Sequence, residues 1–280
     1  MKILVTGGAG FVGTNLIKRL LEGGHDVTSI DNYSTGLKSN HQQSCEYKEA
    51  NIYDFDWRNE IYDVVFHMAA VARIQPSFEN PIEYFNTNAN GTMQLAEHCA
   101  KHDIPIIYAG SSSHHSGKYK NPYTFSKDIG EEILELFAMN FGLNYAITRF
   151  YNVYGPHQLT EGGYTTLIGR WMNNIEKGIP CEIYGDGDQR RDFTHVDDIV
   201  DGLVRIQQQQ SYSGTTNPHI YEFGRGKNFS VNEVADMFGI EPVYRPGKDG
   251  EARDTLCTSS EAHECLGWNP QKDLLHYIQK

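Results

Sequence analysis

The sequence predicts an α/β protein with a doubly wound parallel sheet and a smaller C-terminal lobe. Two observations carry this prediction. Short apolar runs alternate with helical patterns through the first half of the chain, and a glycine-rich turn stands between the first run and the first helix. A repeated order of strand, helix and strand is typical of a parallel sheet with helices on both faces.

The strands are predicted where apolar residues run without interruption, as in parallel strands that are buried on both sides. These runs are Ile3–Val5, Val27–Ile30, Val64–Phe66, Ile104–Tyr108 and Tyr145–Thr148. Apolar residues at helical spacing predict the helices between them, which are Phe11–Glu22, Ile82–His102 and Tyr123–Phe141.

Beyond Tyr151 this pattern loosens, and glycine and proline gather in clusters such as Gly162-Gly163 and Pro246-Gly247. We therefore expect residues 1–151 to form the sheet domain. Residues 152–280 should mostly form a smaller lobe over the strand ends, where ligands bind in such sheets.

Composition excludes several classes of partner. The chain has 280 residues and a formal net charge of -12, which disfavours binding to nucleic acid or to an anionic membrane. It shows no signal peptide, and no apolar run approaches the ~20 residues that span a bilayer. The five cysteines are scattered without a CxxC pair, so we expect reduced thiols, a cytoplasmic location and no metal site.

The turn after the first predicted strand has the form of a dinucleotide-binding loop. It reads Thr6-Gly7-Gly8-Ala9-Gly10-Phe11-Val12-Gly13 and opens the first helix. Glycines at positions 7, 10 and 13 permit a tight turn and a close approach of the backbone to a pyrophosphate. The N-terminus of the helix, at Phe11 and Val12, offers its free N–H groups to the phosphates. This strand–turn–helix context predicts a Rossmann-type cofactor site.

The acidic residue that ends the second strand indicates which dinucleotide binds. Asp31 can accept both hydroxyls of the adenosine ribose and would repel a 2′-phosphate, and Asn32 follows it. The sequence therefore predicts NAD as the cofactor in preference to NADP.

A Tyr-x-x-x-Lys pair follows at Tyr123 and Lys127, directly after Pro122, which suits a helix start. Residues four apart share a helix face, so the two side chains should point the same way. Tyrosine is a poor base at neutral pH, because its usual pKa is about 10. A nearby ammonium group and a positive nicotinamide ring would favour the phenolate.

With these motifs, nearly the whole chain resembles the extended short-chain dehydrogenase/reductase family, in its branch of nucleotide-sugar epimerases and dehydratases. The resemblance implies that the adenine lies beside Asn51-Ile52, where the family has Asp-Ile. His67-Met68-Ala69-Ala70 matches a family segment on which the cofactor rests. Asn88–Thr92 matches a segment on the nicotinamide side. The predicted cofactor site is completed by Thr87, Tyr123, Lys127 and Tyr151.

The same resemblance implies a catalytic Ser or Thr before the tyrosine. Counting without gaps from Asn88–Thr92 places it on Ser112, with Ser111 and Ser113 as alternatives. The loop that follows is short, and His114-His115 replaces the usual family ending. We expect these histidines to be polar loop residues that point apart, with a contact to the sugar as the alternative. We expect no metal there, because no carboxylate or cysteine stands nearby at ligand spacing.

The substrate side is predicted from three further segments. Arg149–Pro156 resembles a family segment whose asparagine, here Asn152, binds the nucleotide diphosphate. The resemblance also places Arg191 on the diphosphate, and Arg253 is expected as a second clamp; a guanidinium suits phosphate. The segment near residues 192–224 should return to the sheet domain, with an Asp of Thr194–Asp198 capping a helix.

Together these motifs predict an NAD-dependent enzyme that inverts C4 of a nucleotide-activated hexose, most simply a UDP-sugar, through a 4-keto intermediate. The alternatives on this scaffold are 4,6-dehydration, decarboxylation and reduction; a more distant one is an NAD-binding regulator without catalysis. Dehydratases of the family carry an Asp-Glu pair after the Ser/Thr, but here Ser113 and His114 follow Ser112. The family resemblance also implies a homodimer through helices 82–102 and 123–141.

Overall fold

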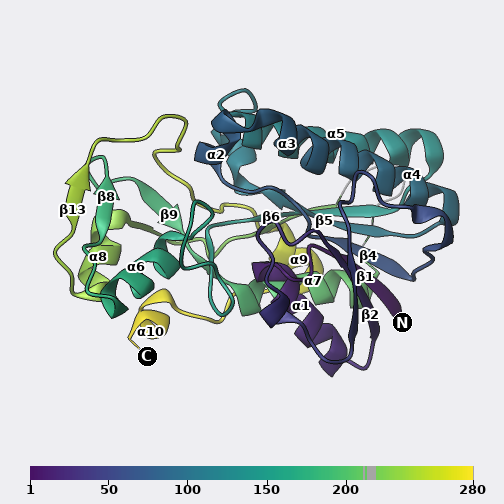
Figure 1. Ribbon diagram of the computed structural model, residues 1–280, viewed down its shortest axis with the longest axis horizontal. Coiled ribbons are helices and arrows are strands. Elements are labelled where there is room, and N and C mark those ends of the chain that lie inside the picture. The colour runs from purple at the N-terminus through teal and green to yellow at the C-terminus, as the bar shows by residue number, and fades with distance from the viewer. Residues whose placement is uncertain (211, 213–218, 280) are drawn as a thin grey trace.

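The computed structural model describes residues 1–210, 212 and 219–279. Its centre is a parallel sheet of seven strands in the order β11-β6-β5-β4-β1-β2-β3 (Figure 1). This confirms the predicted α/β class. The strands are β1 (Lys2–Thr6), β2 (Asp26–Asp31), β3 (Cys45–Glu49), β4 (Val64–His67), β5 (Ile106–Ser111), β6 (Tyr145–Phe150) and β11 (His219–Phe223).

Helices cover both faces of the sheet (Figure 1). One face has a core that includes Leu16, Ile199 and Leu266, and the other has a core that includes Leu95 and Leu134. The first core is covered by α1 (Phe11–Glu22), α7 (Val196–Gln209) and α9 (Glu261–Leu266). The second is covered by α4 (Thr92–His102) and α5 (Pro122–Phe141), with α2 (Ile74–Glu79) and α3 (Pro81–Phe85) alongside.

The predicted helix over residues 82–102 is interrupted. A π-helical turn, Asn86–Gly91, separates α3 from α4. Asn88 in this turn is buried, and its amide is bonded to both backbone groups of Val71 and to the Ser126 hydroxyl. Asparagine is a weak helix former, and here its side chain is fixed by two neighbouring segments. The widened turn presents Thr87 toward the cofactor side of the sheet.

A smaller lobe stands at one end of the sheet (Figure 1). It has a core of its own that includes Trp171, Ile183 and Val234. Its elements are α6 (Leu167–Glu176), α8 (Val231–Phe238) and α10 (Leu274–Ile278), with β8 (Glu182–Tyr184), β9 (Arg190–Asp192), β12 (Asn228–Ser230) and β13 (Val243–Arg245). The short strands β7 (Val153–Tyr154) and β10 (Thr194–His195) pair with each other.

Three elements from the second half of the chain pack with the sheet, namely α7, β11 and α9. We propose to assign all three to the sheet domain, including α9, which the sequence analysis placed in the smaller lobe. The cap of α7 also differs from the expected Asp. His195 Nδ1 accepts from the backbone N–H of Asp197 at 3.1 Å, whereas Asp198 accepts from the N–H groups of Gln271 and Lys272.

Side chains of the sheet domain reach across to the smaller lobe and donate to its backbone carbonyls. Four such hydrogen bonds run from Asn15 to Pro156 (2.9 Å), Arg73 to Tyr164 (3.0 Å), Gln75 to Asp249 (2.8 Å) and Lys120 to Glu251 (3.0 Å). They hold the lobe over the carboxyl ends of the strands.

Within the described residues, no helix is long and apolar enough to cross a membrane. All five cysteines are free, and Cys99, Cys181 and Cys257 are buried. The cytoplasmic location stays a prediction.

Candidate active site

A cavity of about 580 Å³ opens where the carboxyl ends of the central strands face the smaller lobe. Most residues predicted from the sequence line it, although they come from distant parts of the chain. They are Gly7, Gly10, Phe11, Val12, Gly13, Asp31, Asn32, Asn51, Ile52, Met68, Ala69, Ala70, Thr87, Ser112, Tyr123, Asn152 and Arg191. Lys127, Tyr151 and Arg253 do not line this cavity.

The glycine-rich turn has the close packing that a dinucleotide site requires. Gly7 has φ +70°, and a Cβ atom there would lie 2.8 Å from the backbone of Ala69. A Cβ atom on Gly13 would lie 2.2 Å from the Gly7 carbonyl oxygen. The N-terminus of α1 has no side-chain cap, so its N–H groups can bind a pyrophosphate. These residues therefore fit the adenine dinucleotide.

Asp31 lies at the end of β2 and is only 7% exposed. Its carboxylate accepts from the backbone N–H groups of Ala9 (2.9 Å) and Tyr33 (2.8 Å). Burial raises the pKa of Asp31, and these two N–H donors oppose the rise. Beside it, the Asn32 amide donates to Asn51 Oδ1 at 2.7 Å, which joins two residues predicted to contact the adenosine.

We predict that Asp31→Ala weakens NAD binding by about tenfold or more, because hydrogen bonds to a charged group are each worth about 1.5–3 kcal/mol. The preference for NAD over NADP should shrink at the same time. Titrating both cofactors into stripped wild-type and variant protein measures both effects. An NADP affinity equal to that for NAD in the wild-type protein would show that Asp31 does not set the preference.

Tyr123 stands in the first turn of α5, which a cap fixes in place. The Asn121 side chain accepts from the N–H of Thr124 at 2.8 Å, and Pro122 occupies the first helical position. Burial raises the pKa of Tyr123, while a hydrogen bond with the Ser111 side chain and the charge of Arg73 lower it. The net effect is a raised pKa, and Ser111 and Arg73 offset part of the effect of burial.

Lys127 lies one turn further along α5 and is 3% exposed. Its Nζ atom stands 4.1 Å from the centre of the Tyr108 ring. Burial lowers the pKa of Lys127 to about 7, and the charges of Glu131 and Asp128 oppose this effect. The predicted Tyr–Lys pair therefore sits on a single helix, with the lysine in the interior and the tyrosine at the cavity wall.

Ser111, the last residue of β5, is the serine whose side chain lowers the pKa of Tyr123, whereas the expected catalytic serine is its neighbour Ser112. Ser112 begins the 3₁₀ turn Ser112–Ser116 and also lines the cavity. Ser111 Oγ additionally accepts from the N–H of Ser113 at 3.2 Å. Both serines line the cavity, so the choice between Ser112 and its alternative Ser111 stays a prediction.

We predict that Ser111→Ala lowers kcat about ten- to hundredfold, because the phenolate loses a charge-assisted hydrogen bond. The matched variant Ser112→Ala should lower kcat much less. Steady-state rates of the two variants on the same nucleotide sugar decide the question. A larger loss in Ser112→Ala would restore the assignment made from the sequence.

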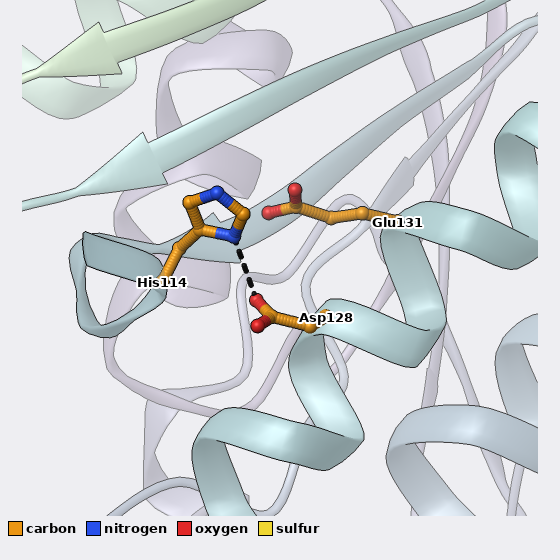
Figure 2. Close-up of side chains that lie close together, drawn as sticks. All are labelled: His114, Asp128 and Glu131. Atoms are coloured by element: carbon orange, nitrogen blue, oxygen red, sulfur yellow. Dashed lines mark hydrogen bonds and ion pairs between the residues drawn. The ribbon is translucent and has the colours of Figure 1, made fainter. Parts of the chain in front are cut away.

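The rings of the two histidines lie close together, with centroids 5.4 Å apart and planes at 87°, but each bonds to a different acid. His114 Nδ1 lies 2.9 Å from Asp128 Oδ1, and His115 pairs with Glu222. Figure 2 shows His114 with Asp128 and Glu131, whose ligand-type atoms lie within 4.8 Å of one another. Carboxylates therefore do lie near His114, contrary to the reason given above for expecting no metal. Arg149 bonds to both oxygens of Glu131, at 3.1 and 2.6 Å, and neutralises that carboxylate.

Two residues predicted to contact a ligand, Tyr151 and Arg253, lie outside the lining of the main cavity. The Tyr151 hydroxyl donates to Glu222 at 2.7 Å and faces a second cavity of about 250 Å³, while Phe150 lines the main one. Arg253 lines this second cavity and is 63% exposed; it pairs with Asp186 at 2.7 Å. An exposed acid thus holds the guanidinium that we expected on the diphosphate.

Arg191 and Asn152 both line the main cavity. The Asn152 amide is bonded to the Asp192 carbonyl (3.0 Å) and to the Thr255 hydroxyl (3.2 Å). Arg191 is mostly buried and has a long contact of 3.5 Å with Glu251. Two more arginines, Arg73 and Arg170, line the cavity. The sequence analysis did not single them out, because neither belongs to a segment that it used.

We predict that Arg191→Ala raises KM for the nucleotide sugar by about tenfold or more, through the loss of a charge-assisted contact. Arg253→Ala should change it by less than about twofold, as is usual for exposed ion pairs. NAD affinity, measured in parallel, should stay constant in both variants. An equal increase of KM in Arg191→Ala and Arg253→Ala would indicate that Arg253 also binds the diphosphate.

Comparison with known proteins agrees with this geometry. Residues 3–224 match the model of the NAD dependent epimerase/dehydratase family. The chain is 33% identical to a putative UDP-glucose 4-epimerase of Methanocaldococcus jannaschii, over 99% of this chain and 96% of that protein. It is 29% identical to a UDP-N-acetyl-alpha-D-glucosaminuronate decarboxylase of Bacillus cytotoxicus, over 84% and 78%. The crystal structure of Thermotoga maritima UDP-glucose 4-epimerase with UDP-glucose superposes with a TM-score of 0.91, at 29% identity over 100% and 96%.

The fold, the dinucleotide turn and the family match together define an NAD-dependent enzyme of the epimerase/dehydratase class. The chain belongs to the NAD-dependent epimerase/dehydratase family, and NAD is its cofactor.

Proposed function

We propose that the enzyme inverts C4 of a nucleotide-activated hexose, with a UDP-sugar as the substrate. The observation that supports this most is the placement of Tyr123, with Ser111 bonded to it, in the wall of the cavity between the dinucleotide turn and the smaller lobe. A sugar bound by its diphosphate at Arg191 would extend toward this phenol.

The residues divide the work as follows. NAD, when bound, supplies a reversible hydride acceptor for C4. Tyr123 removes the proton from the 4-hydroxyl, and Ser111 donates a hydrogen bond to the oxygen that carries the charge. The charge of Arg73 lowers the pKa of the phenol, and Lys127 in its protonated form would favour the phenolate as well. Tyr123 would hold the proton while the 4-keto sugar turns about its diphosphate link, and would return it to the sugar oxygen once C4 is reduced on its other face.

Dehydration between C5 and C6 needs an acid and a base beyond the tyrosine. The two positions after Ser111 hold Ser112 and Ser113, and neither is a carboxylic acid. The same holds for the register expected from the sequence, in which Ser113 and His114 follow. The 4-keto sugar would therefore keep its C6 oxygen until the hydride returns, which favours epimerisation over 4,6-dehydration.

The test is to incubate the protein with UDP-glucose, UDP-galactose and their N-acetyl and uronic acid forms, and to record masses and proton spectra. A product of unchanged mass with an altered H4 coupling supports epimerisation. Loss of water would mean dehydration, and loss of carbon dioxide would mean decarboxylation, the activity in the name of the Bacillus relative. No turnover on any substrate would favour the non-catalytic regulator.

We also propose that the protein forms a homodimer through α4 and α5. Large apolar side chains are exposed on this surface, among them Met93 (45%), Leu136 (55%) and Met139 (67%). Exposed apolar groups gathered on neighbouring helices are typical of an interface with another chain. Light scattering of the wild-type protein and of Leu136→Asp tests this proposal, since a charge on this surface should leave a monomer.

A further inference from the structure

Arg73 has a backbone conformation that an arginine rarely adopts. Its φ is +105° and its ψ is 140°, just before α2. This region of conformational space is strained for any residue with a Cβ atom and is strongly favoured by glycine. The chain nevertheless has an arginine at this position, where glycine would be unstrained, and this points to a role for the arginine side chain.

Arg73 lines the main cavity, as does the predicted catalytic tyrosine, Tyr123. Its charge lowers the pKa of Tyr123, so the two groups lie within electrostatic reach of each other. Its Nε atom donates to the Tyr164 carbonyl at 3.0 Å. Within the described residues, its two terminal nitrogens make no hydrogen bond and no carboxylate pairs with it.

A second arginine of the same cavity has a similar environment. Arg170 on α6 donates from Nε (2.9 Å) and Nη2 (2.7 Å) to the Thr165 hydroxyl, and in the described part of the chain it has no ion pair. Its charge and that of Arg73 repel each other, so the two guanidinium groups are near neighbours. The acid nearest in charge to Arg170 is Glu182, which is already paired with Arg245 at 2.8 Å. Arg73 has no such acid among the described residues, and a partly buried cation without an anion is costly unless a ligand supplies one.

From this geometry we infer that the cavity contains a carboxylate-binding subsite at Arg73, with Arg170 nearby, so that the preferred substrate is a nucleotide-activated hexuronic acid. This inference rests on the proposed function and names its substrate class. The reacting C4 must lie at the Tyr123 oxygen, and C6 of the same sugar is only two bonds away. A C6 carboxylate would reach the group beside Tyr123, and a guanidinium binds a carboxylate through two parallel hydrogen bonds.

Arg73 is distinct from the cation that serves the diphosphate. Arg191 lies on β9 in the smaller lobe, whereas Arg73 belongs to the sheet domain and adjoins the phenol. A neutral hexose would leave Arg73 without an anion, while a hexuronic acid supplies one. The hydroxyls of Ser112 and Ser113, which also line the cavity, can donate to the same carboxylate.

The test measures, by calorimetry on NAD-loaded protein, the Kd values of UDP-glucuronic acid, UDP-glucose and UDP. Wild-type protein should bind UDP-glucuronic acid about tenfold or more tightly than UDP-glucose, as one charge-assisted pair implies. Arg73→Gly should abolish this preference, with little change in the affinity for UDP. Because glycine suits the backbone at this position, the variant should keep or exceed the wild-type Tm.

Two controls complete the experiment. Asp103→Gly relieves a positive φ of 54° at the end of α4, outside the residues that line the cavity, and should leave the preference intact. Arg73→Lys should retain part of the preference, because it keeps the charge but not the paired donors. Equal wild-type affinities for the two sugars, or a preference that survives in Arg73→Gly, would overturn the subsite.

The turnover assay separates this inference from the proposed function. Conversion of UDP-glucose to its C4 epimer without a binding preference for the uronic acid would refute the subsite and leave epimerisation standing. A clear preference together with decarboxylation, or with no turnover, would support the subsite and refute epimerisation.

Discussion

Tyr123→Phe should fold, bind NAD and lose about 10²–10⁴-fold in kcat, the usual contribution of a general base. We expect Tyr123 to be the general base because it lines the cavity and because both the Ser111 side chain and the charge of Arg73 lower its pKa. Phenylalanine keeps the ring and its edge contact with Tyr84, so the fold loses little. The loss should therefore appear in kcat and leave the Kd of NAD almost unchanged.

The measurement is the steady-state rate with a saturating nucleotide sugar, together with NAD affinity and a thermal melt. Tyr151→Phe is the matched control, because its hydroxyl is bonded to Glu222 and faces the second cavity. Near-wild-type activity in Tyr123→Phe would remove this residue from the reaction. An equal loss of kcat in Tyr151→Phe would show that removing either buried tyrosine hydroxyl lowers the rate, and that the loss is not specific to Tyr123.

Lys127→Met should lower kcat about 10²–10³-fold, as is usual when a preorganised charge is removed from an active site. Methionine fills a similar volume beside the Tyr108 ring, so packing is preserved. Lys101→Met, which removes an exposed lysine from α4, is the matched control and should retain full activity. Full activity in Lys127→Met would mean that the phenolate forms without this cation.

The same variant should change how stability depends on pH. Burial lowers the pKa of Lys127 to about 7, whereas a lysine in an unfolded chain has a pKa of about 10.4. Between these values the unfolded chain holds a proton that the folded protein lacks, so this group makes the free energy of unfolding rise with pH. Lys127→Met removes that contribution. Urea titrations at pH 7 and pH 9 without added cofactor should show a larger rise for wild type; parallel rises would contradict the lowered pKa.

Sequence reasoning located the fold and the cofactor side well, because these depend on local patterns. The turn at Gly7–Gly13 and the Asp31 carboxylate each follow a strand at a fixed spacing, and α1 has the predicted bounds Phe11–Glu22. Likewise Tyr123 and Lys127 lie on one face of α5 because helical spacing requires it.

The contacts that sequence reasoning missed depend on where side chains meet in space. Ser111 and Ser112 cannot be told apart until the end of β5 is known. Arg253 has the right chemistry for a diphosphate, but the loop places it beside Asp186. Arg73 stands outside the segments that were matched, and its positive φ and position beside Tyr123 emerge only from the folded chain.

The hydrogen bonds that hold the smaller lobe over the sheet determine which residues can be substituted without losing them. Each of the four ends on a backbone carbonyl of the lobe, at Pro156, Tyr164, Asp249 and Glu251. Every amino acid supplies this acceptor, so substitutions in these loops leave closure of the lobe intact. The loops are therefore free to diverge toward new sugars, while each of the donors Asn15, Arg73, Gln75 and Lys120 supplies one of the four bonds from the sheet domain. Exchanging these loop sequences between relatives should accordingly change substrate specificity without weakening the attachment of the smaller lobe to the sheet domain.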